Sequence, residues 1–423
     1  MKRITAIIAF LLPLMLEAQE STPAWNEINP SVMEAIRENP LRAGVNTCPY
    51  EYVPGPETKV PKGYKAFYIS HFGRHGSRTN WPEEGTAYEE TLQLYDRAAE
   101  AGILTPQGDS IRTCIREIIR EFAGMGGRLT YRGTREHREI AARMYGRFRK
   151  VFRQGDRRIR AIASISPRCL VSMAAATGEL LSLDPTLDIR WDSGENYMSY
   201  MVTDSSPELR STAVGFQKSY LKAHTPDTAA FIMKIFTDPG RVRQTVGDPV
   251  ELMRRTFDVA HNQGAMDMDP YIFRCFTTED LYHYEASISL QQYLRHCNSL
   301  DFSDLRLPSV RPLVDDFVDK ADECIETGKY VADLRYAHDS QLMAFASLIG
   351  LEAVGPQRSI AEAALWPGYL VTPFAANLLA VFYRNKDNDI LVKFYYNERE
   401  QRILSLPGGP YYKWEEVKSH MKR

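Results

Sequence analysis

The sequence predicts an α/β protein whose open, mostly parallel sheet is flanked by helices and interrupted by an inserted helical cap domain. Short apolar runs at 66–72, 159–165 and 333–338 indicate strands, and helical periodicity follows each of them. This alternation is typical of a largely parallel sheet with helices on its faces. Two apolar runs joined by a turn within 374–396 predict a hairpin. Between 186 and 320 strand signals vanish and helical patterns take over, which predicts the cap.

Length and composition set the predicted domain organisation. The 423 residues are 44% hydrophobic and 25% charged, as in ordinary soluble globular proteins. We expect a catalytic α/β domain formed by 19–185 and 321–423, with the helical cap domain at 186–320 between its two parts. A formal net charge of -2 argues against general affinity for nucleic acid or acidic membranes. Any anion site must therefore be a local concentration of basic residues.

Apolar residues at three- and four-residue spacing predict the helices in chain order. A proline-rich lead-in at 19–64 is expected to be irregular apart from one short helix. The predicted helices are 31–38, 88–101, 105–122, a long one opening within 129–140, 173–181, 207–223, 227–235, 249–262, 281–294, one from 340 to Gly350, and a terminal one after Trp414.

The N-terminus has the features of a secretory signal. Lys2 and Arg3 precede an apolar run at 4–16 that is short for a membrane span, and Ala18 is a suitable cleavage position. Residues 1–18 are therefore predicted to be a signal peptide. No later apolar run is long enough to cross a membrane. We expect an exported protein, periplasmic or secreted, that is monomeric.

The cysteines predict no metal site. An even number, six, in an exported protein permits disulfides, and Cys275 with Cys297 is the first pair to test. Cys169 is expected to be a buried free thiol. The sequence has no Cys-x-x-Cys or Cys/His ligand spacing, so a zinc site is not predicted.

The candidate functional site begins at the end of the strand at 66–72. The chain turns there at Gly73 and Gly76, and Arg74, His75 and Arg78 lie in and after the turn. Guanidinium groups match pairs of phosphate oxygens, and glycines let backbone N–H groups approach an anion. The imidazole is the group able to attack phosphorus. A chance tripeptide in a surface turn is the alternative interpretation.

The motif Arg74-His75-Gly76-x-Arg78 after a strand resembles the active-site signature of the histidine phosphatases. The fuller string is similar to the histidine acid phosphatase branch, which includes phytases and multiple inositol polyphosphate phosphatases. Residues 408–414 also resemble the C-terminal part of the latter group. The resemblance covers most of 44–180 and 325–420.

Two later strand ends supply further candidates. The strand at 159–165 runs into Arg168 and Ser172, and ligands of open α/β sheets gather at the carboxyl ends of strands. The resemblance implies that Arg168 is a third arginine that binds the phosphate, although Ile165 stands where the family has a serine. The strand at 333–338 ends in His338-Asp339, which could form a helix cap or, by resemblance, the His-Asp motif opposite the nucleophile.

Ser340 departs from the family patterns, and His137 is not assigned to the site. Ser340 follows His338-Asp339, where acid phosphatases commonly have Thr, whereas inositol polyphosphate phosphatases usually have His-Ala-Glu at this place. His137 begins as a candidate, because a Leu-Thr-x-x-Gly-x-x-x-His stretch is similar to one in the acid phosphatases. On a helix rich in arginine and glutamate, we expect it to belong to a solvated face.

The resemblance implies hydrolysis of a phosphomonoester through a phosphohistidine. His75 would attack with one ring nitrogen while the other donates to a backbone carbonyl. Asp339 would protonate the leaving group and then activate water, and a free aspartic acid titrates near about 4, which favours acidic operation. No metal ion or other cofactor is expected. The residues expected to hold the phosphate oxygens are Arg74, Arg78, Arg168 and protonated His338.

Inositol polyphosphates are the expected substrates, as for a phytase. A broad-specificity acid phosphatase acting on sugar phosphates or other small phosphomonoesters is the alternative. A phosphoglycerate-mutase-like enzyme would share the Arg-His-Gly motif, but the export signal and the large insertion disfavour it. A non-catalytic anion binder is disfavoured by the intact His75 and Asp339.

Overall fold

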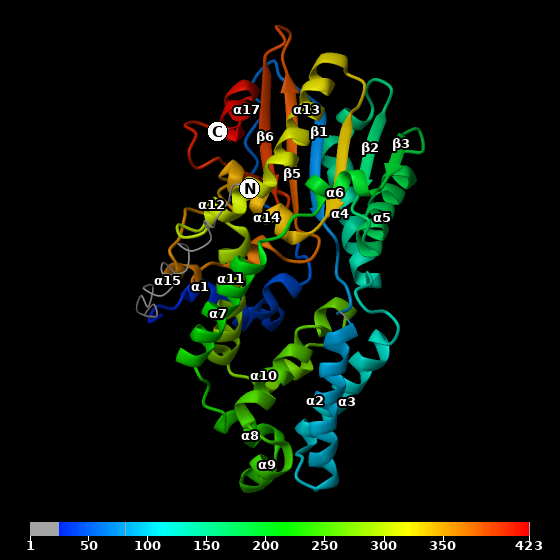
Figure 1. Ribbon diagram of the computed structural model, residues 1–423. Helices are drawn as coiled ribbons and strands as arrows, with labels where there is room; N and C mark the ends of the chain where they lie inside the picture. The colour runs from blue at the N-terminus through cyan, green and yellow to red at the C-terminus, as the bar shows by residue number, and fades with distance from the viewer. Residues whose placement is uncertain (1–24, 81, 423) are drawn as a thin grey trace, which may run out of the picture.

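The computed structural model describes residues 25–80 and 82–422. Its eight-stranded sheet has the order β3-β2-β4-β1-β5-β6-β7, with β8 paired to β6 (Figure 1). Strands β1 to β4 run parallel to their neighbours among themselves, and β5 joins β1 antiparallel. This confirms the predicted fold class. The strands are β1 Lys65–Arg74, β2 Arg158–Ala163, β3 Asp188–Asp192, β4 Ala332–Ala337, β5 Asn377–Arg384, β6 Ile390–Tyr396, β7 Arg399–Gln401 and β8 Tyr412–Lys413.

Both faces of the sheet are covered by helices because its central strands carry apolar side chains on both faces. In β1, Ile69 packs with the apolar side chains of two helices, α4 and α5. Tyr68 and Phe72 point to the other face, where they join the main core with three further helices, α13, α14 and α17. These five helices are α4 Tyr131–Phe152, α5 Pro167–Leu183, α13 Arg311–Thr327, α14 Asp339–Ile349 and α17 Trp414–Met421.

A helical lobe lies beyond the carboxyl ends of the parallel strands (Figure 1). It combines α2 and α3, which precede β2 in the chain, with α8, α9 and α10. Tyr95 Oη and Thr256 Oγ1, 2.9 Å apart, form a buried hydrogen bond between the two groups. The division into catalytic and cap domains stays a prediction. The helices are α2 Pro82–Glu100, α3 Pro106–Phe122, α8 Ala229–Ile235, α9 Pro239–Val246 and α10 Pro249–Ala260.

The remaining helices connect this lobe to the sheet. The long α11 packs against α7, α1 and the 3₁₀ segment Pro40–Thr47 that precedes the first strand. Three of these helices, α1 Pro30–Glu38, α7 Pro207–Ala223 and α11 Thr278–His296, fall close to their predicted bounds. The sequence analysis did not predict the four short helices α6 Met198–Met201, α12 Ser303–Arg306, α15 Ile360–Ala363 and α16 Gly368–Val371.

Strand β3 corrects the expectation that strand signals vanish after residue 186. It pairs in parallel with β2 at the edge of the sheet. Only Ile189 among its five residues is buried. An edge strand this short and this exposed shows no apolar alternation, which explains why the sequence pattern missed it.

Cys275 and Cys297, the first pair to test for a disulfide, are not joined in this structure. Both cysteines are buried free thiols, and they flank opposite ends of α11, a helix of 19 residues. Such a helix is about 28 Å long, whereas the Cα atoms of a disulfide lie within about 7 Å. Cys169 is a buried free thiol, as predicted.

The predicted signal peptide, residues 1–18, lies outside the described residues. Within the part of the chain that the structure does describe, no helix combines the length and apolar character that a membrane span requires.

Glu285, on α11, is a buried carboxyl that should make stability depend on pH. It is 1% exposed, its Oε1 accepts one hydrogen bond of 2.7 Å from Ser289 Oγ, and burial raises its pKa to about 8. An unfolded glutamate has a pKa near about 4.3. Between these values the folded state keeps a proton that the unfolded state has lost, so the free energy of unfolding falls as pH rises.

We therefore expect Glu285→Gln to flatten this pH dependence. Thermal unfolding between about pH 5 and 9 should show the melting temperature of the parent protein falling more steeply than that of the variant. Glu279→Gln changes an exposed residue of the same helix and should follow the parent. Identical slopes for the parent and Glu285→Gln would contradict the assignment.

Candidate active site

Three neighbouring parallel strands bring all six predicted site residues to one edge of the sheet. Arg74, the last residue of β1, lies opposite Ala337, the last residue of β4. The His75 amide donates to the Ala337 carbonyl over 3.0 Å, so the His75 turn and the His338-Asp339 turn begin side by side. Strand β2 lies on the other side of β4 and leads into Arg168 at the start of α5.

The imidazole of His75 is held in one tautomer. Its Nδ1 lies 2.9 Å from the carbonyl oxygen of Gly76, and a carbonyl can only accept, so Nδ1 carries the proton and Nε2 keeps its lone pair. The ring is 3% exposed. Burial, followed by the charges of Arg74 and Arg168, holds the pKa of His75 well below its usual value. A neutral imidazole with a free Nε2 is the form that a nucleophile requires.

Arg74 is fixed by protein contacts on several sides. Its Nη2 lies 2.9 Å from Asp339 Oδ2. Its Nη1 donates to the carbonyl oxygens of Asn46 at 2.6 Å and Thr372 at 2.9 Å. The guanidinium carbon lies 4.8 Å from the ring centroid of Phe374. Burial lowers the pKa of Arg74 to about 10, which leaves it cationic at neutral and acidic pH.

The other two arginines and His338 complete the basic group. Arg168 Nη2 lies 3.4 Å from His338 Nδ1, and Arg78 Nη1 donates to the Thr79 carbonyl over 2.8 Å. The Nε2 of His338 lies 3.2 Å from Ser164 Oγ. Burial and then the charge of Arg168 lower the pKa of His338 to about 4. Its protonation, which the sequence interpretation assumed, therefore needs an anion among these groups to favour the charged form.

The pKa of Asp339 is lowered, whereas burial alone would raise the pKa of a carboxyl group. Burial raises its pKa, but the Arg74 guanidinium, followed by His296 and His338, brings the pKa well below its usual range. The carboxylate also lies within 3.4 Å of Asn46 Nδ2. In this arrangement Asp339 is ionised, and a role as proton donor requires part of the surrounding positive charge to be neutralised.

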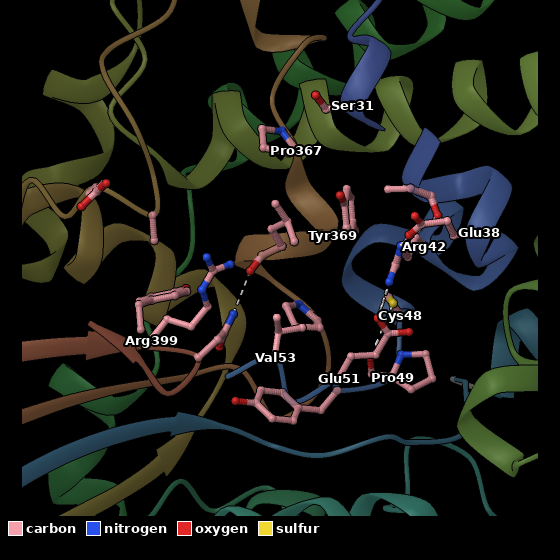
Figure 2. A pocket seen from close by; sticks show the side chains of 18 of the residues that line it. Ser31, Glu38, Arg42, Cys48, Pro49, Glu51, Val53, Pro367, Tyr369 and Arg399 are labelled. Carbon is pink, nitrogen blue, oxygen red and sulfur yellow. Dashed lines mark hydrogen bonds and ion pairs between the residues drawn. The ribbon is translucent and has the colours of Figure 1, made fainter. Parts of the chain in front are cut away.

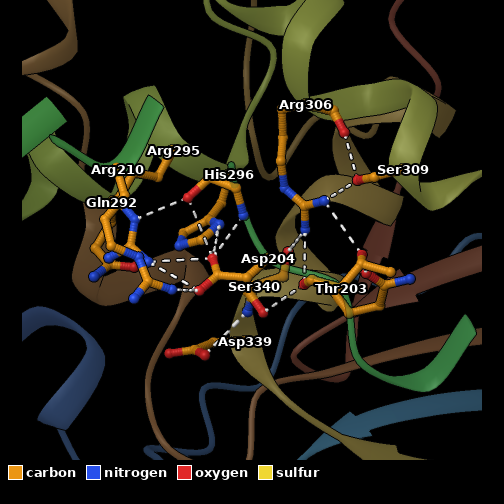
Figure 3. A network of polar contacts seen from close by, with 12 residues as sticks. Thr203, Asp204, Arg210, Gln292, Arg295, His296, Arg306, Ser309, Asp339 and Ser340 are labelled. Carbon is orange, nitrogen blue, oxygen red and sulfur yellow. Dashed lines mark hydrogen bonds and ion pairs between the residues drawn. The ribbon is translucent and has the colours of Figure 1, made fainter. Parts of the chain in front are cut away.

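A polar network from the region between β3 and β4 holds the Asp339 turn (Figure 3). Arg306, which is fully buried, donates from Nη2 to the carbonyl oxygens of Ser340 at 2.8 Å and Thr203 at 3.3 Å. Ser340 Oγ donates to the Thr203 carbonyl over 3.1 Å, and the Ser340 amide donates to Asp339 Oδ1 over 3.0 Å. No sequence motif links these residues, because they come from three distant segments.

Helix α4 packs against the turn that contains His75 and holds it in place. A Cβ atom on Gly76 would lie 2.5 Å from the carbonyl oxygen of Gly133, so both positions need glycine for this close approach. Glu136 accepts from the Ser77 amide at 2.8 Å and from Ser77 Oγ at 2.7 Å. It also accepts from the Tyr50 amide at 3.2 Å. The sequence interpretation missed Glu136, although its three-residue spacing from Gly133 places both on one face of the helix.

His137 does not belong to a solvated face, as the sequence interpretation expected. It is 2% exposed, and its ring centroid lies 5.6 Å from that of Tyr336. Burial lowers its pKa to about 3. The physical reason is the contact between Gly76 and Gly133, which presses this face of α4 against the sheet.

A separate cleft of about 640 Å³ lies away from this cluster (Figure 2). Cys48 and Glu51 are among the residues that line it, as are Tyr369 and Arg399. Arg42 and Glu51, which both line it, form an ion pair of 2.9 Å. None of the six predicted site residues lines this cleft, so it is not the site of the predicted chemistry.

Comparison with known proteins identifies the family. A model of the histidine phosphatase superfamily (branch 2) matches residues 73–397. The chain therefore belongs to this family and is a phosphoric monoester hydrolase, which confirms the resemblance drawn from the Arg-His-Gly motif. No curated protein sequence matches the chain.

Solved structures with the same fold include two of the multiple inositol polyphosphate phosphatase of Bifidobacterium longum. The complexes of that protein with phosphate and with inositol hexasulfate superpose with TM-scores of 0.72 and 0.70, each at 18% identity over 90% of this chain and 97% of that chain. The phytase from D. castellii superposes with a TM-score of 0.68 at 15% identity over 91% of this chain and 85% of that chain.

Glu136→Gln should weaken the support beneath His75. The amide cannot accept all the hydrogen bonds now received by the carboxylate, and one buried donor would face an NH₂ group. The free energy of unfolding should fall by about 1–3 kcal/mol, and kcat should fall with it, measured by denaturant unfolding and phosphate release. Glu139→Gln, an exposed change on the same helix, should stay within about 0.5 kcal/mol of the parent. Equal stability of both variants would contradict the role of Glu136.

Proposed function

We propose that this member of the histidine phosphatase superfamily, branch 2, hydrolyses inositol polyphosphates through a phosphohistidine intermediate. The observation that carries the proposal is the state of His75. The Nδ1 contact with the Gly76 carbonyl leaves Nε2 unprotonated, and Arg74 and Arg168 lie close enough to depress the pKa of the ring. A nucleophile surrounded by guanidinium groups suits attack on a phosphate, whose negative oxygens those groups bind.

The first step transfers the phosphoryl group to the protein. His75 Nε2 attacks phosphorus and forms an N–P bond while the P–O bond to the alcohol breaks. Asp339 gives its proton to the departing alcohol oxygen. Water then attacks phosphorus, the N–P bond breaks, and a proton of that water returns to Asp339. Inorganic phosphate leaves, and both side chains regain their starting forms.

Substrate binding supplies the condition that Asp339 needs. Arg74 keeps the pKa of Asp339 well below its usual range, so the acid form is scarce while the basic groups are uncompensated. A phosphate dianion among them offsets their charge and raises the pKa of both Asp339 and His338. The substrate thus promotes protonation of its own proton donor, and the reaction favours acidic pH.

Inositol polyphosphates are proposed as substrates from the sequence resemblance in 44–180 and 325–420 and from the fold shared with two such phosphatases. The sequence His338-Asp339-Ser340 favours a second candidate, a broad-specificity acid phosphatase acting on sugar phosphates or other small phosphomonoesters. This motif is closer to the acid phosphatases than to the His-Ala-Glu of the inositol polyphosphate phosphatases. We also propose export to the periplasm or medium from the pattern of residues 1–18; the monomeric state stays a prediction.

Phosphate release separates these candidates. Purified protein should release phosphate from inositol hexakisphosphate faster than from glycerol 2-phosphate, and EDTA should not change either rate. A preference for the small ester would favour the broad-specificity enzyme. Release from neither compound would refute the phosphatase proposal, and loss of activity with EDTA would refute a metal-free reaction.

Asp339→Asn tests the proton donor. General acid catalysis contributes about 10²–10⁴-fold, so glycerol 2-phosphate hydrolysis should slow by an amount in this range. Hydrolysis of p-nitrophenyl phosphate should slow much less, because its leaving group departs without a proton. Asp304→Asn, an exposed change, serves as the control for both rates. Equal slowing of the two substrates by Asp339→Asn would assign the residue to phosphate binding or structure instead.

A further inference from the structure

The loop between α3 and α4 runs directly beside the phosphate-binding turn. The Thr79 amide donates to the Arg128 carbonyl over 2.9 Å, and the Arg128 amide donates to Thr79 Oγ1 over 3.0 Å. Arg78 and Leu129 form an antiparallel bridge next to them. These contacts fix the backbone of Arg128 relative to Arg78, one of the predicted phosphate-binding residues.

Arg128 and Arg168 line one cleft of about 280 Å³. The cleft therefore borders the group of basic residues around His75, because Arg168 belongs to both. Among the described residues that line the cleft none is a carboxylate, and Arg128 and Arg168 are its charged residues. The lining residues are Gly124, Met125, Arg128, Leu129, Pro167, Arg168 and Val171.

The Arg128 guanidinium makes no hydrogen bond or ion pair with another side chain in the described ranges, although its backbone is held on both sides. Two nearby arginines, in contrast, lie beside carboxylates. Arg132, on α4, forms an ion pair of 3.0 Å with Asp267, and Arg120, on α3, lies 3.5 Å from Glu121. Arg128 is exposed, so its planar donors are available to a ligand in the cleft.

We propose that Arg128 forms a second anion subsite next to the reacting phosphate and binds a neighbouring phosphate group of the same substrate. This inference rests on the proposed function, because it assigns that site a preference for polyphosphorylated polyols. A second phosphate would lie between Arg128 and the outer side of Arg168, where it offsets their mutual repulsion. A monophosphate would reach only the reacting position. Arg128 is thus a specificity-determining residue that raises kcat/KM for polyphosphates alone.

Kinetics of Arg128→Gln test the subsite. The change keeps a polar side chain at an exposed position and removes the charge. We expect kcat/KM for inositol hexakisphosphate to fall about tenfold, as loss of one charge-assisted contact predicts, and kcat/KM for p-nitrophenyl phosphate to stay unchanged. Arg120→Gln removes an exposed arginine of the preceding helix and should alter neither value. Equal loss on both substrates, or loss on neither, would overturn the proposal.

Binding gives a readout that does not depend on turnover. The dissociation constant of the non-hydrolysable inositol hexasulfate, measured by calorimetry, should rise about tenfold in Arg128→Gln, while that of inorganic phosphate should not change. An unchanged inositol hexasulfate affinity would refute the subsite even if the enzyme is active. A parent protein that binds inositol hexasulfate through Arg128 but hydrolyses no ester would refute the proposed function and keep the subsite.

Discussion

The ion pair between Arg74 and Asp339 is the interaction on which the site depends. It joins Arg74, the last residue of β1, to Asp339, which follows the end of the adjacent parallel strand β4. The nearest nitrogen and oxygen atoms are 2.9 Å apart, and Arg74 is 2% exposed. A guanidinium buried this deeply is costly unless its charge and donors are satisfied. The carbonyls of Asn46 and Thr372 satisfy Nη1 and the ring of Phe374 faces the guanidinium, whereas Nε has no hydrogen-bond partner among the described residues. The basic group therefore exists in a fixed geometry before any phosphate enters it.

One positive field acts on the protonation states of three residues. Burial, followed by this field, lowers the pKa of His75 and of His338, and the field outweighs burial to lower that of Asp339. For His75 this is the reactive form, since Nε2 needs its lone pair. For the other two residues it is the wrong form for the proposed step, because each has to carry a proton. An anion that offsets the field shifts all three pKa values upward, but the Gly76 carbonyl still directs the His75 proton to Nδ1.

The parts of the site that follow strands could be predicted from the sequence, because strand ends and their turn residues are local signals. His75, Arg168 and His338 belong to this class, as does the parallel sheet that brings them together. The burial of Glu136 and His137 could not be foreseen in the same way. It depends on the approach of Gly76 to Gly133, a contact between segments whose composition indicated a solvated helix. Strand β3 was missed because an exposed edge strand lacks apolar alternation.

The proposed nucleophile, His75, and the proposed acid, Asp339, are held by different parts of the chain. Helix α4 supports the His75 turn through Gly133 and Glu136, whereas Arg306 and Thr203, from the long segment between β3 and β4, hold the turn of Asp339. The Arg74–Asp339 ion pair, the backbone pairing of β1 with β4 and the contact between the His75 and His338 rings connect the two directly. Substitutions in the inserted segment can therefore alter the acid's position without disturbing the tautomer of His75. In the proposed mechanism, sequence divergence in that segment affects protonation of the leaving group by Asp339 before it affects attack at phosphorus by His75.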